Sequence, residues 1–208
     1  MTNFRDAVRF AGVIAIVLAG AVTLSAGESA SNSRASLDEL DAPKYEFAVE
    51  SAYLLGAFNN PHGYEIGAQF LTARMRFAVV ENDSWLRGYH QFYLSAVAEP
   101  IFRGPENYYF GFNMGLRYNF VRSGSRLLPY ISGGVGAGSI DSHADNRGAQ
   151  GQDFTFNILT AAGVSYKVND RWKLNAGLLY QHLSNAGQTD PNPSLNLLGP
   201  QLGVTYSF

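Results

Sequence analysis

From Tyr45 to the last residue, the sequence repeats short segments in which apolar side chains alternate with small or polar ones. Clusters of glycine, proline, asparagine, aspartate and serine, all turn-forming residues, separate the segments. A period of two is that of a β-strand, whose successive side chains point to opposite faces. The predicted strands cover residues 45–58, 63–79, 86–98, 107–120, 127–140, 153–167, 171–184 and 195–208.

The segment 107–120 shows which kind of sheet these strands form. One face carries the large apolar residues Tyr108, Phe110, Phe112, Met114, Leu116, Tyr118 and Phe120. The other face carries Gly111, Asn113, Gly115, Arg117 and Asn119. A soluble β-sandwich also alternates, but a narrow glycine-rich polar face is typical of a tightly packed barrel lumen. An apolar face that ends in aromatic residues is typical of a wall in contact with lipid.

The predicted fold class is therefore all-β, an eight-stranded antiparallel transmembrane barrel of the bacterial outer membrane. Bacterial barrels of one chain have an even number of strands, and eight is a common small number. The interior of such a barrel is filled by side chains, which disfavours transport. The chain ends in Phe208, as outer-membrane barrels often do, although one residue is weak support. With both termini periplasmic, the turns after the odd strands face outside.

The first residues resemble a secretory signal peptide rather than a strand. Arg5 and Arg9 precede the apolar stretch from Phe10 to Leu24, and small residues follow it. A membrane-anchoring helix, the alternative, usually needs about 20 apolar residues. We expect residues 1–26 to form a signal peptide, 27–44 a flexible periplasmic lead-in rich in serine, alanine and aspartate, and 45–208 the barrel.

Composition excludes several classes of protein. A formal net charge of −2 does not favour nucleic acid as a partner. The chain has no cysteine, which excludes disulfides, thiolate zinc sites and a cysteine nucleophile. The histidines and carboxylates show no spacing typical of metal ligands, so we expect no bound metal.

The segment 171–184 breaks the rule that the lipid-facing row is apolar. Its even positions run from Trp172 through leucine, alanine and tyrosine, and then place His182 and Ser184 on the same face. Polar groups in lipid are costly unless they have partners or a function. Two residues apart on a strand, the side chains are within about 7 Å, so the imidazole can reach the hydroxyl. A solvated strand end is the simpler alternative.

The next segment offers a residue that could orient the imidazole. Asn196 has the parity of the outward residues and lies near the outer end, where it can flank His182 across the ladder. Pro200 lies in the same row and lacks a backbone N–H, so a bulge there could shift the register.

The run from His182 to Gly187, His-Leu-Ser-Asn-Ala-Gly, is followed by Pro-Asn-Pro at 191–193. This run, with the barrel pattern and the terminal phenylalanine, resembles the lipid A 3-O-deacylase family of outer-membrane acyl-ester hydrolases. The specificity of the resemblance lies in residues 180–208.

The resemblance implies a role for each matching residue. Ser184 would be the nucleophile and His182 its general base. The Gly187 backbone N–H and the Asn192 side chain would form the oxyanion hole, next to Asn185. The alternative is that Gly187 serves a turn and Asn192 shapes a loop. This chemistry requires no cofactor.

The sequence departs from the family pattern at Asn196, where the family has a glutamate. An amide oxygen can hold the imidazole tautomer but adds no charge to stabilise an imidazolium. Three outcomes remain open: a weaker orienter, rescue by Asp190 in the adjoining loop, or a barrel without catalysis. A solvated loop carboxylate is the simpler role for Asp190. If the amide is a weak orienter, Asn196→Glu should raise turnover.

Other candidate residues give weaker indications of a catalytic or ligand-binding site. Ser139, Asp141 and His143 contain the three residue types of a triad, but they lie in a flexible loop entry. His62 lies in a turn and His90 in a strand. The glycine-rich stretch 133–138 lacks the lysine and the helix of a nucleotide-binding loop, and in a small barrel its glycines more simply relieve crowding.

The leading hypothesis is an outer-membrane serine esterase that removes the 3-O-linked 3-hydroxyacyl chain from lipid A of lipopolysaccharide. The partners would be lipid A and outer-membrane lipid, with a homodimer possible. The alternatives are a non-catalytic barrel with a structural, adhesive or lipopolysaccharide-binding role, and an acyl hydrolase or transferase acting on phospholipid.

Overall fold

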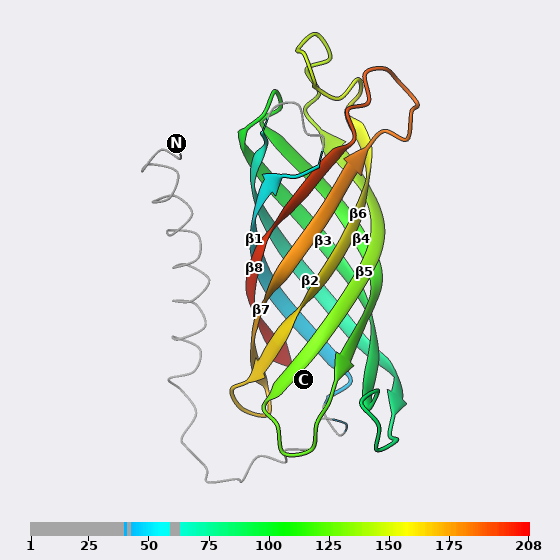
Figure 1. The fold of residues 1–208 in the computed structure, drawn as a ribbon, viewed down its shortest axis with the longest axis vertical. Helices are drawn as coiled ribbons and strands as arrows, with labels where there is room; N and C mark the ends of the chain where they lie inside the picture. The colour runs from blue at the N-terminus through cyan, green and yellow to red at the C-terminus, as the bar shows by residue number, and fades with distance from the viewer. Residues whose placement is uncertain (1–39, 41–42, 59–62) are drawn as a thin grey trace.

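In the computed structural model, eight antiparallel strands close into a barrel in which each strand pairs with its neighbours in sequence and β1 pairs with β8 (Figure 1). The structure describes residue 40 and residues 43–58 and 63–208. The strands are β1 (Tyr45–Gly56), β2 (Glu65–Val80), β3 (Gly88–Arg103), β4 (Tyr108–Phe120), β5 (Leu127–Ile140), β6 (Phe154–Lys167), β7 (Trp172–Ser184) and β8 (Leu195–Ser207). The predicted fold class is confirmed.

The observed strand bounds differ little from the predicted ones, except that β3 continues to Arg103. The register of β7 against β8 is continuous and pairs Leu178 with Pro200, so the bulge that Pro200 could have caused is absent. Pro200 lies inside β8 and lacks a backbone N–H, but the pairs on both sides of it keep the ladder in register. The pairing of β2 with β3 has two irregularities instead, one of them between Arg76 and Ala78.

The alternation sorts side chains between wall and lumen as predicted. Phe112 is 63% exposed on the outer wall, whereas its neighbour Asn113 is 1% exposed in the lumen. Ring contacts join aromatic residues near both ends of the wall, as in Tyr108–Phe110 at the start of β4 and Tyr118–Phe120 at its end. These pairs fit the two interfaces between hydrocarbon and water.

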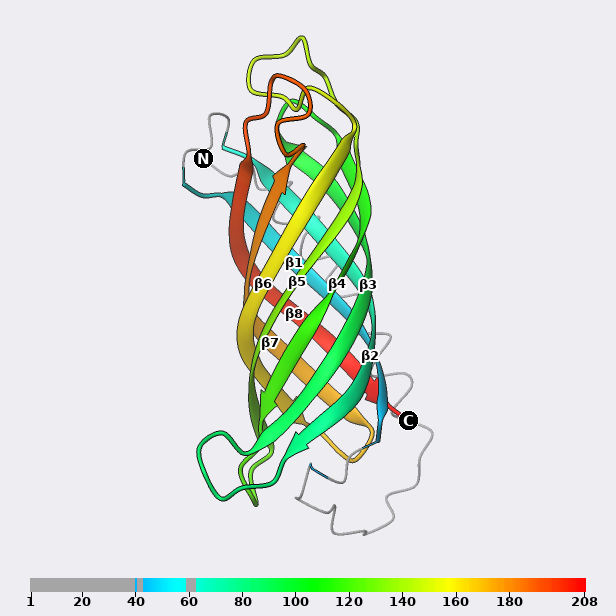
Figure 2. The same cartoon turned by 90° about the vertical axis from the view of Figure 1, so that its right-hand side faces the viewer.

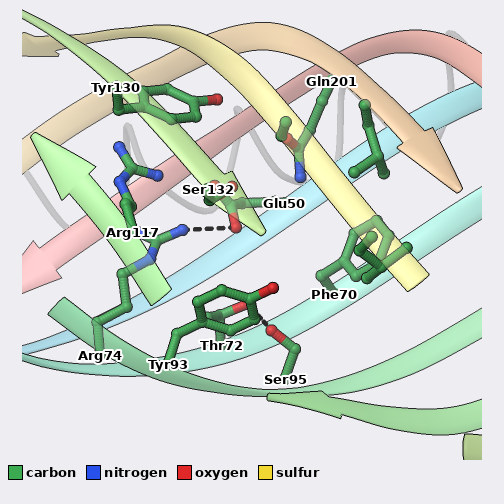
Figure 3. A pocket seen from close by; sticks show the side chains of 13 residues that line it. Glu50, Phe70, Thr72, Arg74, Tyr93, Ser95, Arg117, Tyr130, Ser132 and Gln201 are labelled. Atoms are coloured by element: carbon green, nitrogen blue, oxygen red, sulfur yellow. Dashed lines mark hydrogen bonds and ion pairs between the residues drawn. The ribbon is translucent and has the colours of Figure 1, made fainter. Parts of the chain in front are cut away.

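The lumen is filled by side chains of two kinds. A polar network includes the ion pair Arg74–Glu50 at 2.7 Å (Figure 3). It also includes the ion pair Lys173–Glu46 at 2.7 Å. A buried apolar cluster closes the other half, with members Leu54, Tyr64, Ile66, Tyr109, Ile140, Leu183, Leu195 and Leu197. Buried charges need partners, and the network supplies them. The predicted packed interior is therefore confirmed.

The two ends of the barrel differ in their loops. Segments 141–153 and 185–194 follow β5 and β7 at one end, and the C-terminus lies at the other (Figures 1 and 2). Outer-membrane barrels have short periplasmic turns and longer extracellular loops. The end of β7 that carries His182 and Ser184 is thus the extracellular end.

The expected signal peptide, residues 1–26, and nearly all of the lead-in 27–44 lie outside the described residues. Leu40 is an exception: it packs against buried Tyr89, Val121 and Leu128 near the periplasmic end, and its carbonyl accepts a hydrogen bond from Arg76. Among the described residues, no helix is long and apolar enough to cross a membrane.

Candidate active site

The outer ends of β6, β7 and β8 place the candidate residues side by side on the barrel wall. His182 pairs with Asn196 of β8 on one side and with Ile158 of β6 on the other. Ser184 pairs with Phe156 of β6. The side chains of directly paired residues lie on the same face of a sheet. The predicted juxtaposition of His182, Ser184 and Asn196 is therefore present in the register itself.

Burial shows that this face is the outer wall. The flanking residues Gln181 and Leu183 are fully buried in the lumen, whereas Leu178, in the row of His182, is 57% exposed. His182 and Ser184 are half-buried. A polar pair thus interrupts an apolar surface near the extracellular rim.

A hydrogen bond fixes the imidazole. His182 Nδ1 lies 2.9 Å from Asn196 Oδ1. An amide oxygen only accepts hydrogen bonds, so Nδ1 carries a proton, and in the neutral imidazole Nε2 then holds the lone pair. This is the tautomer that a general base needs in order to accept a proton from a serine hydroxyl.

Three further contacts hold the Asn196 amide in this orientation. The Tyr180 hydroxyl donates to Asn196 Oδ1 at 2.7 Å. Asn196 Nδ2 donates to the carbonyl oxygens of Ser194 at 3.1 Å and Phe58 at 3.3 Å. The position thus offers donors to one side of the amide and acceptors to the other, which suits an amide better than a carboxylate.

Tyr180 was not singled out by the sequence analysis. The available signal is its place two residues before His182 on the same face, which brings its hydroxyl to the partner of the imidazole. Only the contact itself distinguishes it from the other outward aromatic residues of the wall.

Ser184 has a backbone neighbour rather than an imidazole partner. The Ala186 N–H donates to Ser184 Oγ at 3.4 Å. Between the described residues His182 and Ser184 the structure shows no hydrogen bond. Ala186 adopts a positive φ of 57°, a conformation that a residue with a Cβ rarely adopts and that often marks functional sites.

Asn185 organises the loop that follows. It is fully buried, and its Nδ2 donates to the carbonyl oxygens of Thr189 at 2.6 Å and Pro191 at 3.5 Å. Its Oδ1 accepts the Gly187 N–H at 2.9 Å, and its own N–H donates to Asn192 Oδ1 at 3.2 Å. The Gly187 N–H is thus already engaged, whereas the Asn192 interaction leaves the amide donors of that side chain available.

Contacts with the neighbouring loop hold the segment 185–194 in place. Gln152 donates to Gln188 at 2.9 Å and accepts from the Thr189 hydroxyl at 2.5 Å. Asp190 is exposed on this loop. Neither a hydrogen bond nor an ion pair joins it to His182 in the described part of the chain, whereas Asn196 is a hydrogen-bond partner of the imidazole there.

The remaining candidates lie elsewhere. His62 lies outside the described residues, and the His90 ring packs edge-on against Tyr118 on the wall. The glycines at 133–138 belong to β5, where a Cβ at Gly134 would lie 2.2 Å from the Tyr93 hydroxyl. The described residues hold no group of three or more histidine, cysteine, aspartate or glutamate side chains able to bind a metal ion.

Two solved structures share the architecture. The outer-membrane enzyme PagL matches with a TM-score of 0.52 and 16% identity, over 74% of this chain and 97% of that one. Neisserial surface protein A matches with a TM-score of 0.57 and 16% identity, over 79% of this chain and 97% of that one. An enzyme and a surface protein thus share this fold, so the fold alone does not specify an activity.

Comparison of sequences adds to what the shared fold shows about the enzyme and the surface protein. The protein opa of Haemophilus influenzae is 26% identical over 100 residues, which cover 47% of this chain and 78% of that protein. The family model of the lipid A 3-O-deacylases (PagL) matches residues 62–205, and these include every residue of the site apart from the Phe58 carbonyl. This outer-membrane β-barrel protein belongs to the lipid A 3-O-deacylase (PagL) family.

Proposed function

We propose that the protein is a serine esterase that removes the 3-O-linked 3-hydroxyacyl chain from lipid A, with Ser184 as nucleophile, His182 as general base and Asn196 as the residue that orients the imidazole. One observation carries the proposal: the hydrogen bond from His182 Nδ1 to Asn196 Oδ1, which leaves Nε2 free on the face that carries Ser184. The PagL family match supports the choice of substrate.

The reaction has two steps. Ser184 Oγ attacks the ester carbonyl while its proton passes to His182 Nε2. The bond to the sugar oxygen then breaks, and the imidazolium returns the proton to that oxygen. Water then gives a proton to the same imidazole as it attacks the acyl-serine; the bond to Ser184 Oγ breaks, the imidazolium returns the proton to Oγ, and the 3-hydroxy fatty acid leaves.

The wall location suits a lipid substrate. An ester at the outer rim of the hydrocarbon reaches Ser184 without leaving the membrane, and the surrounding wall is apolar. Ile158 and Leu178, 43% and 57% exposed, flank the site. Contacts between these side chains and the acyl chains position the ester at no cost of extraction from the bilayer.

Two donors near Ser184 support an oxyanion hole in this proposal. The Ala186 N–H already lies within hydrogen-bonding distance of Ser184 Oγ, and the Asn192 amide lies on the loop fixed by Asn185. Donation by Gly187 requires its N–H to leave Asn185 Oδ1. We therefore assign the oxyanion role to Ala186 and Asn192 before Gly187.

The absence of a hydrogen bond between the described residues Ser184 and His182 is consistent with their proposed roles as nucleophile and general base. Catalytic hydrogen bonds are often long without substrate and tighten when substrate binds. The alternative of a non-catalytic barrel rests on the same missing hydrogen bond and on the neutral Asn196. The esterase and the non-catalytic barrel predict different outcomes for lipid A: the first shortens it by one acyl chain and the second leaves it unchanged.

The test is mass spectrometry of lipid A from cells that make the parent protein or Ser184→Ala. We expect loss of one hydroxyacyl group with the parent and a decrease in rate of at least about 10³-fold with the variant. The matched control is Ser142→Ala, because the Ser142 hydroxyl donates to the Gln150 carbonyl. Unchanged lipid A with the parent supports the non-catalytic barrel, and accumulation of lysophospholipid supports a phospholipid substrate.

A further inference from the structure

Arg117 of β4 is a buried arginine whose charge no described carboxylate balances directly. It is 4% exposed, and no ion pair joins it to a carboxylate in the described part of the chain. Arginine is almost never fully buried without a partner. The other buried charges in the polar half of the lumen are held in ion pairs: Arg74–Glu50, Lys173–Glu46 and Lys167–Asp170. This half of the lumen therefore carries an excess of one positive charge.

The carboxylates of the lumen cannot supply the missing partner. Glu50 lines the same cavity as Arg117, but its Oε2 accepts a hydrogen bond from Arg74 at 2.7 Å, and its Oε1 faces an asparagine amide at 3.4 Å. Glu99 belongs to the apolar half, where it pairs with Tyr109. Tyr109 lies eight positions before Arg117 on β4, which is about 26 Å along the strand.

The contacts of the Arg117 guanidinium are all with neutral groups. Nε donates to Asn119 Oδ1 at 2.9 Å, and Nη2 donates to Ser165 Oγ at 2.7 Å. The guanidinium carbon lies 3.6 Å from the centroid of the Tyr130 ring, a cation–π contact. These partners hold the guanidinium in place but bring no negative charge, and Nη1 has no hydrogen bond to a described residue.

A cavity of about 40 Å³ lies in the lumen beside this group. Arg117, Arg74 and Glu50 line it, and Figure 3 shows the two guanidinium groups next to one another at one side. A cavity needs about 10–15 Å³ for each water molecule that it holds. This cavity therefore has room for a monatomic ion or about three waters.

The cavity is also lined by hydrogen-bond donors that lack acceptors. Ser132 is the direct pairing partner of Arg117 on β5, and Gln201 of β8 is 7% exposed. Neither side chain has a hydrogen bond to a described residue. The Tyr130 hydroxyl, which belongs to the same lining, is buried and has no partner either. Hydroxyl and amide groups can donate, and buried polar groups are normally bonded, so the missing group is an acceptor.

We propose that this cavity, which we call the lumen anion site, binds a small monovalent anion of the halide class, held by Arg117 with Ser132 and Gln201 as further donors. The single excess charge sets the valence, the unpartnered donors set the sign, and the volume of about 40 Å³ sets the size. The anion joins β4, β5 and β8 across the lumen and so stabilises the barrel. The inference does not depend on the proposed esterase activity.

Refolding from urea fills a buried site with a chosen anion. The protein is refolded into micelles in sodium bromide or in sodium gluconate at equal ionic strength, and gluconate is too large for the cavity. We expect thermal unfolding, followed by heat-modifiable migration on gels, to occur about 3 °C or more higher in bromide, with a rise that saturates. Equal midpoints in the two salts would mean that the cavity holds only water and would overturn the proposal.

Three variants locate the effect. Arg117→Met removes the charge, and the dependence on bromide should disappear. Arg126→Met changes an exposed arginine and should retain the dependence, which makes it the matched control. Ser132→Ala is a milder change that should raise the half-saturating bromide concentration by about fivefold, and it serves if Arg117→Met does not fold. A dependence that persists in Arg117→Met, or that Ser132→Ala leaves unaltered, would overturn the proposal.

Anomalous scattering from bromide gives the position of the ion directly. In crystals of protein refolded in bromide, we expect a peak in the lumen within about 3.5 Å of the Arg117 guanidinium and the Ser132 hydroxyl. Peaks confined to the outer surface would indicate adventitious ions only and would overturn the lumen anion site.

Discussion

Two clusters at the extracellular end contain histidine, serine and a side chain able to orient an imidazole, yet only one has the geometry of an active site. In the first, on β7 and β8, His182 Nδ1 lies 2.9 Å from Asn196 Oδ1. In the second, after β5, His143 Nε2 lies 3.6 Å from Asp141 Oδ2. The first holds its imidazole between two strands, whereas the second carries it on a loop.

The partners of Asp141 show what the second cluster does. Its Oδ1 accepts the N–H groups of Asn107 and Tyr108 at 2.8 and 2.9 Å, and its Oδ2 accepts Asn107 Nδ2 at 2.7 Å. Burial raises the pKa of this carboxyl, but these hydrogen bonds outweigh it, so the pKa lies below the ordinary value of 3.8. The carboxylate fastens the start of β4 and has little capacity left to orient a base.

Exchange of each histidine for glutamine is expected to give the largest contrast between the clusters. His182→Gln removes the base, and ester hydrolysis should fall by about 10³-fold or more. His143→Gln should keep activity within about twofold, because no described contact ties that ring to Ser184. Initial rates of release of 3-hydroxy fatty acid from purified lipid A measure both.

The retained fold of each variant is checked by heat-modifiable migration on gels. Comparable losses in the two variants would mean that the loop cluster takes part in the reaction. A fully active His182→Gln protein would remove the basis for a serine esterase.

How well each cluster could be predicted from the sequence depends on whether strands or a loop hold its residues. The period of two fixed the strands and the side on which His182, Ser184 and Asn196 lie, because a one-residue slip would turn every apolar residue inward. The lumen followed from the same alternation. The barrel and the three site residues were therefore accessible from sequence.

The loop details were not accessible in this way. The Ala186 N–H near Ser184, and the Asn185 side chain that engages Gly187, depend on turns whose backbone follows no period. Tyr180 had the correct parity, but its hydroxyl acquires meaning only through Asn196, which lies sixteen residues later in sequence. A contact between side chains on two strands, such as Tyr180–Asn196, is lost from a prediction as soon as the register between the strands is predicted wrongly.

Asn196 gives the next largest expected effect. In Asn196→Asp an oxygen replaces Nδ2 and faces the carbonyl oxygens of Phe58 and Ser194, so electrostatic repulsion disfavours the carboxylate. We expect no gain in kcat and a decrease of about tenfold. Asn196→Ala removes the acceptor altogether and should lower kcat by about 10² with little change in KM.

Two variants sharpen this prediction. Tyr180→Phe removes one donor to Asn196 Oδ1 and should lower kcat by about threefold, while Tyr166→Phe, lower on the wall, should not. If the neutral amide is a weak orienter, Asn196→Glu should raise kcat, because a carboxylate also stabilises the imidazolium by its charge. A higher kcat in Asn196→Asp than in the parent would show that the carbonyls do not select the amide.

The smallest expected effect concerns stability at the second cluster. A carboxyl whose pKa is lowered on folding stabilises the protein above its unfolded pKa, and this contribution disappears as the pH falls through the folded value. Asp141→Asn should therefore lower the free energy of unfolding by on the order of 1 kcal/mol at neutral pH, after allowance for solvent screening.

The difference in the free energy of unfolding between Asp141→Asn and the parent should shrink as the pH falls below about 3.8. It should disappear once the Asp141 carboxyl is protonated in both the folded and the unfolded protein. Urea unfolding in micelles, followed by tryptophan fluorescence at neutral and acidic pH, measures this difference, and hydrolysis at neutral pH should remain within about twofold. Because Asp141 only fastens β4, a loss of activity as large as that of His182→Gln would contradict the distinction between the clusters. A pH-independent difference would instead mean that Asp141 acts through packing rather than through its charge.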